Sequence, residues 1–251
     1  MSLETAFTFD SSGIKFGPGA TRKVGFDMKE LGARRVMVTV DPNLVNSETA
    51  SIALGALAHE GIDGVVFDQV RIEPNDVSFK ETIKFATDGQ FDGYLAIGGG
   101  STMDTCKAAN LYATYPADFL NYVNAPIGKA SPVPGTLKPM IAIPTTAGTG
   151  SETTGIAVFG LSELHVKTGI AHRALRPRLG IVDSNNTRTL PRTAVASCGL
   201  DIFSHALESL TALPCFSARL RPAPRCGLPI KGQIPSATSG LQRLRGSWSP
   251  T

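Results

Sequence analysis

Short apolar runs alternate along the chain with longer segments whose apolar residues recur at helical spacing. The runs are rich in valine, isoleucine and leucine, and they end in turn-forming residues such as Asp41, Gly98 and Pro144. This pattern predicts strands at 35–40, 64–67, 94–97, 140–143 and 179–182, and helices at 51–60, 79–86 and 102–112.

The alternation of strands and helices predicts an α/β fold, with helices covering both faces of a parallel sheet. Ligands of such sheets bind at the carboxyl ends of the strands. Three unusual loops follow predicted strands there: Asp41-Pro42-Asn43, a triple glycine at 98–100, and a segment at 145–154 rich in threonine and glycine. We therefore expect a ligand site at this edge of the sheet.

The pattern changes after Pro191, where residues 192–213 have the spacing of one amphipathic helix. We interpret this helix as the first of a separate helical domain. The expected organisation is thus an α/β domain over 1–187, the beginning of a helical domain over 188–215, and a tail over 216–251.

The triple glycine and Ser101 lie between a predicted strand and a predicted helix. Glycines let a backbone approach a ligand closely, and a helix N-terminus offers free N–H groups to an anion. A pyrophosphate fits this description, although a plain tight turn is an alternative. The spacing is not GxGxxG, so the common dinucleotide fingerprint is absent.

The loop at 144–154 carries hydroxyl side chains and glycines directly after another strand. Small hydroxyls can hydrogen-bond phosphate or ribose without filling the space between them. A threonine-rich surface loop or a helix cap is the alternative. Two such loops after two strands of one sheet favour a ligand site.

Asp201 and His205 are four residues apart on the predicted helix at 192–213. On a helix this spacing places both side chains on one face, where a carboxylate and an imidazole can bind one divalent metal ion. A surface hydrogen bond between the two is the alternative. The other histidines, His59 at an exposed helix end and His165 and His172 in a loop around Lys167, are expected to be structural or solvated.

Composition and charge narrow the class of protein. No apolar run approaches the roughly 18 residues of a membrane-spanning helix, and the N-terminus resembles neither a secretory signal nor a transit peptide. Cysteines 106, 198, 215 and 226 form no metal-binding spacing and are expected to be reduced. The net charge is +3, but residues 218–251 hold six basic and no acidic residues, so the rest of the chain is acidic.

Two motifs resemble those of the iron-type (group III) alcohol dehydrogenases: Gly98-Gly99-Gly100-Ser101 followed by Asp104, and Pro144-Thr145-Thr146 followed by Gly148-Thr149-Gly150-Ser151-Glu152. The string from Gly98 to Tyr112 is most similar to the hydroxyacid–oxoacid transhydrogenase branch of that family. The resemblance covers about residues 6–214.

The resemblance implies a dinucleotide-binding domain followed by the first helix of an otherwise missing, all-helical metal-binding domain. It places Asp41 beside the adenosine ribose, Gly99, Gly100 and Ser101 at the pyrophosphate, and Asp104, Thr145, Thr146, Thr149 and Lys167 along the cofactor cleft. An acid at Asp41 favours NAD over NADP, because it would repel a 2′-phosphate. Asp201 and His205 would supply two of four ligands to Fe(II), Zn or Mn, and later histidines would supply the others.

The implied reaction moves a hydride between an alcohol carbon and the nicotinamide, with the metal as Lewis acid. In the transhydrogenase branch, a hydroxyacid such as 4-hydroxybutyrate reduces the bound cofactor and a 2-oxoacid such as 2-oxoglutarate reoxidises it. Lys167, His165, His172 and Arg173 are candidates by charge for binding the substrate carboxylates.

Two other functions stay open: a simple NAD-linked alcohol dehydrogenase and a non-catalytic nucleotide-binding remnant. We expect this truncated chain to be inactive. No nucleic-acid or membrane partner is expected, and a homodimer is possible for the intact protein. The expected compartment is the cytoplasm for a bacterial source and the mitochondrion for a eukaryotic one.

The tail has a composition unlike the rest of the chain, with five prolines and no acids after Ala218. One nucleotide sequence can encode Cys226–Leu241 in one frame and RPAYQGSNPISDIWS in another, and the transhydrogenase branch carries a stretch close to the second. We therefore expect residues 226–241 to be out-of-frame translation and the tail to be disordered, with a genuine divergent tail as the alternative. The genomic sequence of codons 210–251 tests this expectation.

Overall fold

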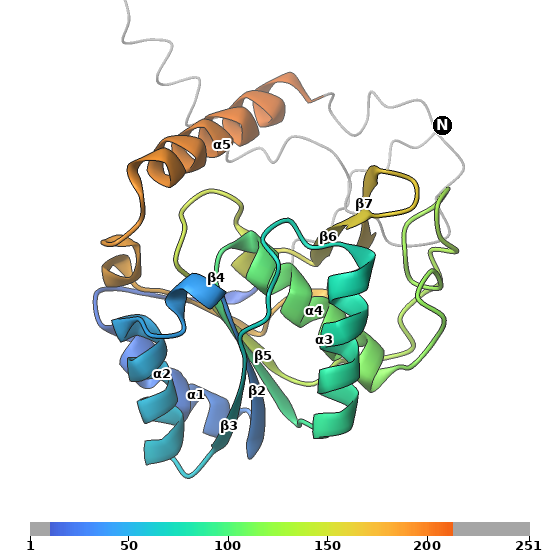
Figure 1. The fold of residues 1–251 in the computed structure, drawn as a ribbon. Coiled ribbons are helices and arrows are strands. Elements are labelled where there is room, and N and C mark those ends of the chain that lie inside the picture. Colours follow the sequence, from blue (N-terminus) through green and yellow to red (C-terminus); the bar gives the residue numbers. More distant parts are fainter. Residues whose placement is uncertain (1–10, 213–251) are drawn as a thin grey trace, which may run out of the picture.

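The computed structural model describes residues 11–212 (Figure 1). Its central sheet has six parallel strands in the order β1-β8-β5-β4-β2-β3. These strands are β1 (Gly13–Phe16), β2 (Arg35–Val40), β3 (Asp63–Phe67), β4 (Gly93–Gly98), β5 (Met140–Pro144) and β8 (Leu179–Val182). A separate antiparallel hairpin is formed by β6 (Ile156–Leu161) and β7 (Val166–Ala171).

Helices cover both faces of the sheet, and a last helix lies apart from them (Figure 1). The helices are α1 (Val24–Glu30), α2 (Glu48–His59), α3 (Asp76–Gly89), α4 (Gly100–Thr114) and α5 (Arg192–Thr211). Short 3₁₀ turns complete the described chain: η1 (Ala20–Lys23), η2 (Pro42–Leu44), η3 (Ser151–Thr153), η4 (Arg173–Leu175) and η5 (Ser184–Thr187).

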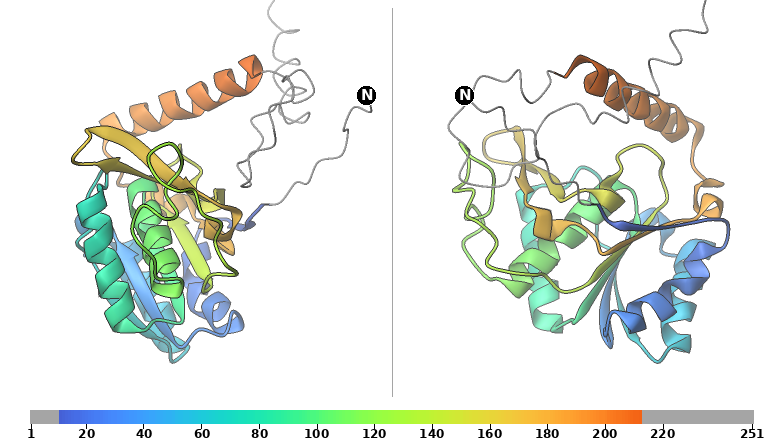
Figure 2. Two further views of the ribbon diagram at one scale, coloured as in Figure 1. Left: turned by 90° about the vertical axis from the view of Figure 1, so that its right-hand side faces the viewer. Right: turned by 180° about the vertical axis from the view of Figure 1, so that it is seen from behind.

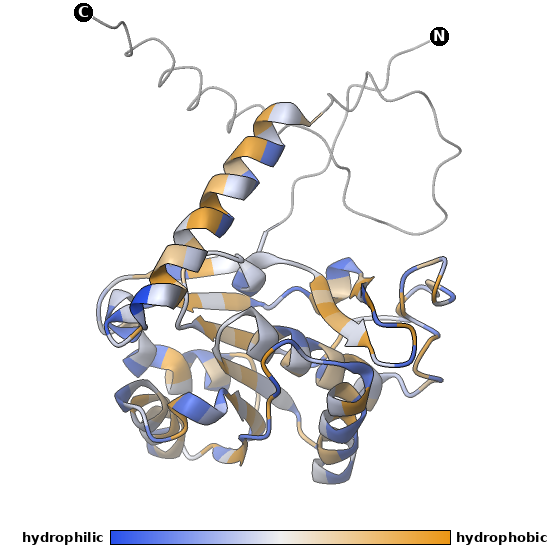
Figure 3. Ribbon diagram, turned by 45° about the horizontal axis from the view of Figure 1, so that its top comes forward, coloured by the Kyte–Doolittle hydropathy of each residue, from blue (hydrophilic) through white to orange (hydrophobic). Residues whose placement is uncertain are grey.

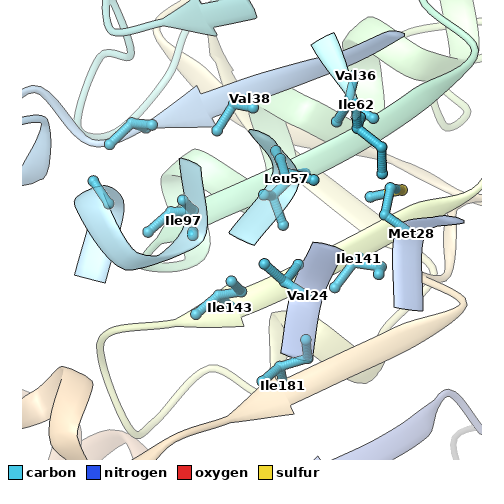
Figure 4. Packing of buried hydrophobic residues seen from close by; sticks show 14 of the residues in the cluster. Val24, Met28, Val36, Val38, Leu57, Ile62, Ile97, Ile141, Ile143 and Ile181 are labelled. Carbon is cyan, nitrogen blue, oxygen red and sulfur yellow. The ribbon is translucent and has the colours of Figure 1, made fainter. Parts of the chain in front are cut away.

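The central strands β2, β4 and β5 are buried at nearly every position because helices cover both faces of the sheet. Side chains alternate along each strand, so Val36 and Val38 of β2 face α1 and α2, while Met37 between them faces α3 and α4. Figure 4 shows the first of these two clusters, in which Leu57 of α2 and Val24 of α1 point into the sheet. The two clusters hold the sheet rigidly between the helix layers.

The strand order brings three loops to one edge of the sheet. β4 lies between β2 and β5, and its last residues pair with theirs, Ile97 with Val40 and Gly98 with Pro144. The chain leaves β2 for the outer strand β3 and returns past β2 to form β4, so the connections diverge between β2 and β4. Ligands of open α/β sheets bind at such a switch point.

The five predicted strands and the predicted helices are all present. Strand β1, helix α1 and the β6–β7 hairpin were not predicted. β1 is a four-residue edge strand with exposed Ile14 and Phe16, so it lacks the apolar run of a buried strand. The expectation of a loop around Lys167 was wrong, because this residue lies in β7, whose polar first half resembles a loop.

Helix α5 begins at the predicted residue and lies apart from the other helices (Figure 2). None of its residues is buried. Apolar residues recur along its length (Figure 3), and five large ones are exposed. They are Val195, Leu200, Ile202, Phe203 and Leu207. The predicted disorder of residues 216–251, and Cys215 and Cys226, lie outside the described residues.

Of the two cysteines in the described part of the chain, Cys106 is buried and Cys198 is half-buried, and both are free. Within residues 11–212, no helix is long and apolar enough to cross a membrane.

Asp183 joins the edge of the sheet to the first turn of the chain. Its carboxylate accepts hydrogen bonds from the N–H groups of Gly19 (2.9 Å), Thr21 (3.1 Å) and Asn185 (3.1 Å), and from the Thr21 hydroxyl (2.9 Å). Burial alone would raise the pKa of Asp183, but the hydrogen bonds from these N–H groups lower it below its ordinary value of 3.8. The charged form is therefore the one that the fold stabilises.

We expect Asp183→Asn to lower the free energy of unfolding by about 1–3 kcal/mol at pH 7, because an amide cannot accept all of these bonds. The folded pKa lies below the unfolded one, so the carboxylate contributes fully above about pH 5 and loses its contribution as pH falls through the folded pKa. Urea unfolding at pH 7 and near pH 3 should show that the difference in the free energy of unfolding between wild type and Asp183→Asn is smaller in acid. Asp88→Asn, at an exposed residue of α3, is the control, and equal effects at both positions would contradict the prediction.

Candidate functional site

Three segments meet at the carboxyl edge of the sheet. Asp41, which follows β2, donates its N–H to the Ile97 carbonyl oxygen of β4 at 3.2 Å. Thr145, which follows β5, donates its N–H to the Gly98 carbonyl oxygen at 3.0 Å. The carboxyl ends of β2, β4 and β5 are therefore joined side by side by hydrogen bonds.

The first loop, residues 98–101, has a backbone that a ligand can approach closely. Gly98 has a φ of +158°, and a Cβ atom there would lie 2.4 Å from the Thr102 hydroxyl oxygen. Gly99 is the N-cap of α4, and its place leaves this 15-residue helix without a side-chain cap. The first N–H groups of an uncapped helix, together with its dipole, form a site for an anion.

The second loop lies directly against the first. A Cβ atom added at Gly99 would stand 3.3 Å from the Thr146 hydroxyl oxygen, and one added at Gly100 would stand 3.2 Å from the Thr149 side chain. The loop also touches α5, because a Cβ atom at Gly148 would lie 2.9 Å from a carboxylate oxygen of Asp201. Both loops and the last helix thus surround one space.

A cleft of about 1060 Å³ opens over this space, between the loops, the hairpin and α5. The sequence-predicted residues that line it are Gly100, Ser101, Asp104, Thr149, Lys167, Asp201 and His205. The other four, Asp41, Gly99, Thr145 and Thr146, lie at the strand ends or in the loops and are not among the lining residues. Two loops more than forty residues apart in sequence are therefore brought to one site.

Glu73 is a cleft residue that sequence reasoning missed. Its φ of +54° is in the left-handed region, which is uncommon for a residue with a side chain and recurs at functional sites. Its N–H donates to the Ser101 hydroxyl oxygen at 3.1 Å, and its carboxylate lies 3.3 Å from the Lys167 ammonium group. Glu73 therefore links two predicted cofactor residues, and no spacing in the sequence signalled it.

Asp104 borders the cleft, but its carboxylate is engaged by the protein. One oxygen accepts from the Ser151 hydroxyl at 2.8 Å, and the other accepts from the Val158 N–H at 3.0 Å. Burial raises the pKa of Asp104, and the nearby Lys107 opposes that shift. These bonds connect α4 to η3 and β6.

Asp201 and His205 lie one turn apart on the side of α5 that faces the cleft, with the His205 Nε2 atom 3.8 Å from an Asp201 oxygen. Both side chains are partly exposed, so a cation could reach them. A carboxylate and an imidazole suit Fe(II), Zn or Mn. Within residues 11–212, no cluster of three histidine, cysteine or acidic side chains could hold a metal ion, so the described part of the chain offers these two donors.

The remaining basic candidates divide between the cleft and its surroundings. His165, at the turn of the hairpin, lines the cleft beside Lys167. His172 and Arg173 do not line it, since His172 caps η4 by accepting from the Ala174 N–H at 3.1 Å. His59 is exposed at the end of α2, as expected.

Residues 11–184 match the family of iron-containing alcohol dehydrogenases. The chain is 53% identical over 214 residues to the mitochondrial hydroxyacid–oxoacid transhydrogenase of Mus musculus, covering 85% of this chain and 46% of the mouse protein. It is 46% identical over 234 residues to the probable mitochondrial hydroxyacid–oxoacid transhydrogenase of Dictyostelium discoideum, covering 88% and 43%. The chain thus spans about half the length of these relatives.

Solved structures have the same fold. The NADH-dependent butanol dehydrogenase A of Thermotoga maritima superposes with a TM-score of 0.76 at 26% identity, over 82% of this chain and 51% of that one. The sulfoacetaldehyde reductase of Bifidobacterium kashiwanohense, solved in complex with NAD⁺, superposes with a TM-score of 0.74 at 27% identity, over 85% and 56%. Each likeness covers more than four fifths of this chain.

Proposed function

The chain belongs to the iron-containing alcohol dehydrogenase family, and we propose that it is the dinucleotide-binding part of a hydroxyacid–oxoacid transhydrogenase. The observation that carries the proposal is the meeting of the two glycine- and hydroxyl-rich loops above an uncapped helix N-terminus. The high identity to the transhydrogenases favours that branch within the family. The activity itself is assigned to the whole protein, of which this chain spans a part.

We propose NAD as the ligand of the cleft. The first N–H groups of α4, with Gly99, Gly100 and Ser101, would hold the pyrophosphate, because an anion gains from both the free donors and the helix dipole. The hydroxyls of Thr145, Thr146 and Thr149 would bind phosphate or ribose oxygens, and Asp104 and Lys167 complete the cofactor cleft. This arrangement needs no side chain at 99 or 100, where the two loops touch.

The nicotinamide would carry the hydride, and a divalent cation held by Asp201 and His205 would act as a Lewis acid on the substrate oxygen. Among this chain's own residues, Lys167 and His165 bring basic side chains to the same cleft. They would bind and orient the carboxylate of a hydroxyacid or an oxoacid. His172 and Arg173 are left out of this role because they lie away from the cleft lining.

A simple NAD-linked alcohol dehydrogenase is the second candidate, favoured by the likeness to the butanol dehydrogenase structure. The whole protein should turn over 4-hydroxybutyrate with 2-oxoglutarate without added NAD if it is a transhydrogenase. Strict dependence on added NAD would favour the dehydrogenase. A chain that binds NAD but shows no turnover in either assay would be a nucleotide-binding remnant.

Localisation follows from the relatives only as a proposal. The mouse and Dictyostelium proteins are mitochondrial, and we propose the same compartment for a eukaryotic source of this chain. We propose a homodimer for the intact protein, and sedimentation at several protein concentrations tests this assembly.

The first test of the proposed function is cofactor choice at Asp41. We expect NAD to bind at least tenfold more tightly than NADP, because the carboxylate would accept from a free ribose hydroxyl and repel a 2′-phosphate. The Asp41 carboxylate accepts a hydrogen bond from the Asn43 N–H at 2.9 Å. Asp41→Ser keeps an oxygen for this bond but removes the negative charge. The substitution should therefore reduce the ratio of the NADP and NAD dissociation constants. Calorimetric titration with both nucleotides measures the ratio.

Asp68→Ser is the matched control, since Asp68 follows the neighbouring strand β3 and is exposed. This variant should keep the wild-type ratio. An unchanged ratio in Asp41→Ser would argue against the assignment of Asp41 to the ribose.

A further inference from the structure

Lys107 is a buried cation with no part in the proposed chemistry. It lies in α4, two turns after the triple glycine, and its side chain has no exposed surface. Lysine is almost never fully buried unless it is paired, because removing an ammonium group from water is costly. The partners of this lysine therefore show what its burial achieves.

The Lys107 ammonium group donates to three oxygen atoms from another part of the chain. They are the Ser151 hydroxyl at 2.8 Å, the Ile156 carbonyl at 2.9 Å and the Thr154 hydroxyl at 3.2 Å. An ammonium group has three hydrogens, so these acceptors match its donors in number. The lysine thereby binds η3 and the first residue of β6 to the middle of α4.

Asp104 completes the same network from the preceding turn of α4. Its carboxylate lies 3.5 Å from the Lys107 ammonium group and accepts from the Ser151 hydroxyl. Ser151 thus bonds to both members of the pair, while the second Asp104 oxygen holds the Val158 N–H. Burial lowers the pKa of Lys107, and the Asp104 carboxylate opposes that shift.

The network joins the two walls of the cleft. Helix α4 begins at the first loop, and the segment 151–158 runs from the second loop into the hairpin that carries Lys167. Ser151, Thr154 and Ile156 line the cleft, whereas Lys107 lies behind them. A change at Lys107 would therefore move the wall without removing a group that touches the ligand.

We propose that Lys107, together with Asp104, is a positioning group that fixes segment 151–158 against α4 and so sets the width of the dinucleotide cleft. The inference rests on the proposed function for its ligand, NAD. The simpler role, support of the core alone, predicts that cofactor affinity follows stability. A positioning role predicts that the two can be separated.

The separating variant is the double substitution Asp104→Asn with Lys107→Met. Lys107→Met alone leaves the Asp104 carboxylate buried without its cation, and such a variant is expected to lose much of its thermal stability. The double variant removes both charges while keeping similar shapes, and it should recover most of that stability. Its Kd for NAD should still be at least tenfold above wild type, because the hydrogen bonds to Ser151, Thr154 and Ile156 remain lost. Asp104 itself lines the cleft, so the Kd of the double variant should also be at least tenfold above that of Asp104→Asn alone, which changes the same carboxylate but keeps the Lys107 bonds.

Three measurements test the proposal on the full chain: the thermal midpoint, the Kd for NAD by calorimetry, and hydrogen exchange without ligand. Amides of 151–158 should exchange faster in the double variant, while those of β2 and α2 should not change. A folded double variant with NAD affinity within twofold of wild type, or with unchanged exchange at 151–158, would overturn the proposal.

Failure of NAD binding and failure of folding can be distinguished from failure of the proposal. If the wild-type chain does not bind NAD, the proposed function fails, yet the exchange measurement still tests whether the network positions 151–158. If the double variant does not fold, Ser151→Ala removes one shared partner and is subject to the same comparison. Lys84→Met, at an exposed lysine of α3, should change neither affinity nor exchange at 151–158.

Discussion

Replacing Gly25 by alanine should be the most destabilising single methyl addition in the helix layers. Gly25 is buried in α1, where this helix crosses α2, and an added Cβ atom would lie 2.0 Å from the Ala56 carbonyl oxygen. The obstructing atoms are backbone, so no rotation of a side chain can relieve the overlap. We expect the free energy of unfolding to fall by about 3 kcal/mol, the upper end of the usual cost of overpacking, because the obstructing backbone cannot give way.

The same substitution one helix away provides the matched control. Gly55 lies on the exposed side of α2, and a Cβ atom there would meet nothing within 4 Å. Gly55→Ala should therefore stabilise the protein by about 0.5–1 kcal/mol through helix propensity. Urea unfolding of both variants measures the difference, and equal midpoints would show that α1 and α2 do not cross at Gly25.

Gly99→Val should abolish useful dinucleotide binding while leaving the fold intact. The backbone at Gly99 is extended, with φ −87° and ψ −168°, so a β-branched residue can adopt it. Its side chain, however, would meet Thr146 and fill the space above the first N–H groups of α4. We expect the Kd for NAD to rise by about a hundredfold or more, which corresponds to about 2.7 kcal/mol.

Calorimetry with NAD and a thermal scan distinguish loss of the site from loss of the fold. Adding Thr146→Ala to Gly99→Val relieves the contact between the loops but leaves the valine over the helix terminus, so binding should stay lost. Recovery of binding in that double variant would mean that the valine acts only by displacing Thr146. Tight binding in the single variant would remove the pyrophosphate from this loop.

The sequence predicts the central strands and the covering helices because each has a distinct hydrophobic period. The run at 35–40 matches β2 at both ends, since a strand buried on both faces is apolar throughout and stops where the chain turns. The edge strand β1 has no such run, because one side of it remains exposed. The hairpin is also hidden, since its second strand begins with exposed residues such as Lys167.

Site residues can be predicted from the sequence where they belong to a local motif. They cannot be predicted where the site depends on contacts between residues far apart in the sequence. The triple glycine and the threonine-rich loop stand out because glycines and hydroxyls are unusual directly after strands. Lys107 does not stand out, since a lysine in a helix is expected to be exposed and its acceptor Ser151 is 44 residues away in sequence. Its three-residue spacing from Asp104 gives no signal of burial, because that spacing is common on helix surfaces.

The absence of a side chain at Gly148 has an energetic consequence for the whole cleft. The backbone of the second loop lies against Cys198 and the Asp201 carboxylate, so a rotation of α5 about its axis would change its contact with this loop. A ligand that favours one orientation of α5 therefore changes the free energy of the second loop, and a ligand on that loop changes the free energy of α5. Thermodynamic linkage makes this coupling reciprocal: occupancy at Asp201 should alter nucleotide affinity by the same factor by which nucleotide alters affinity at Asp201.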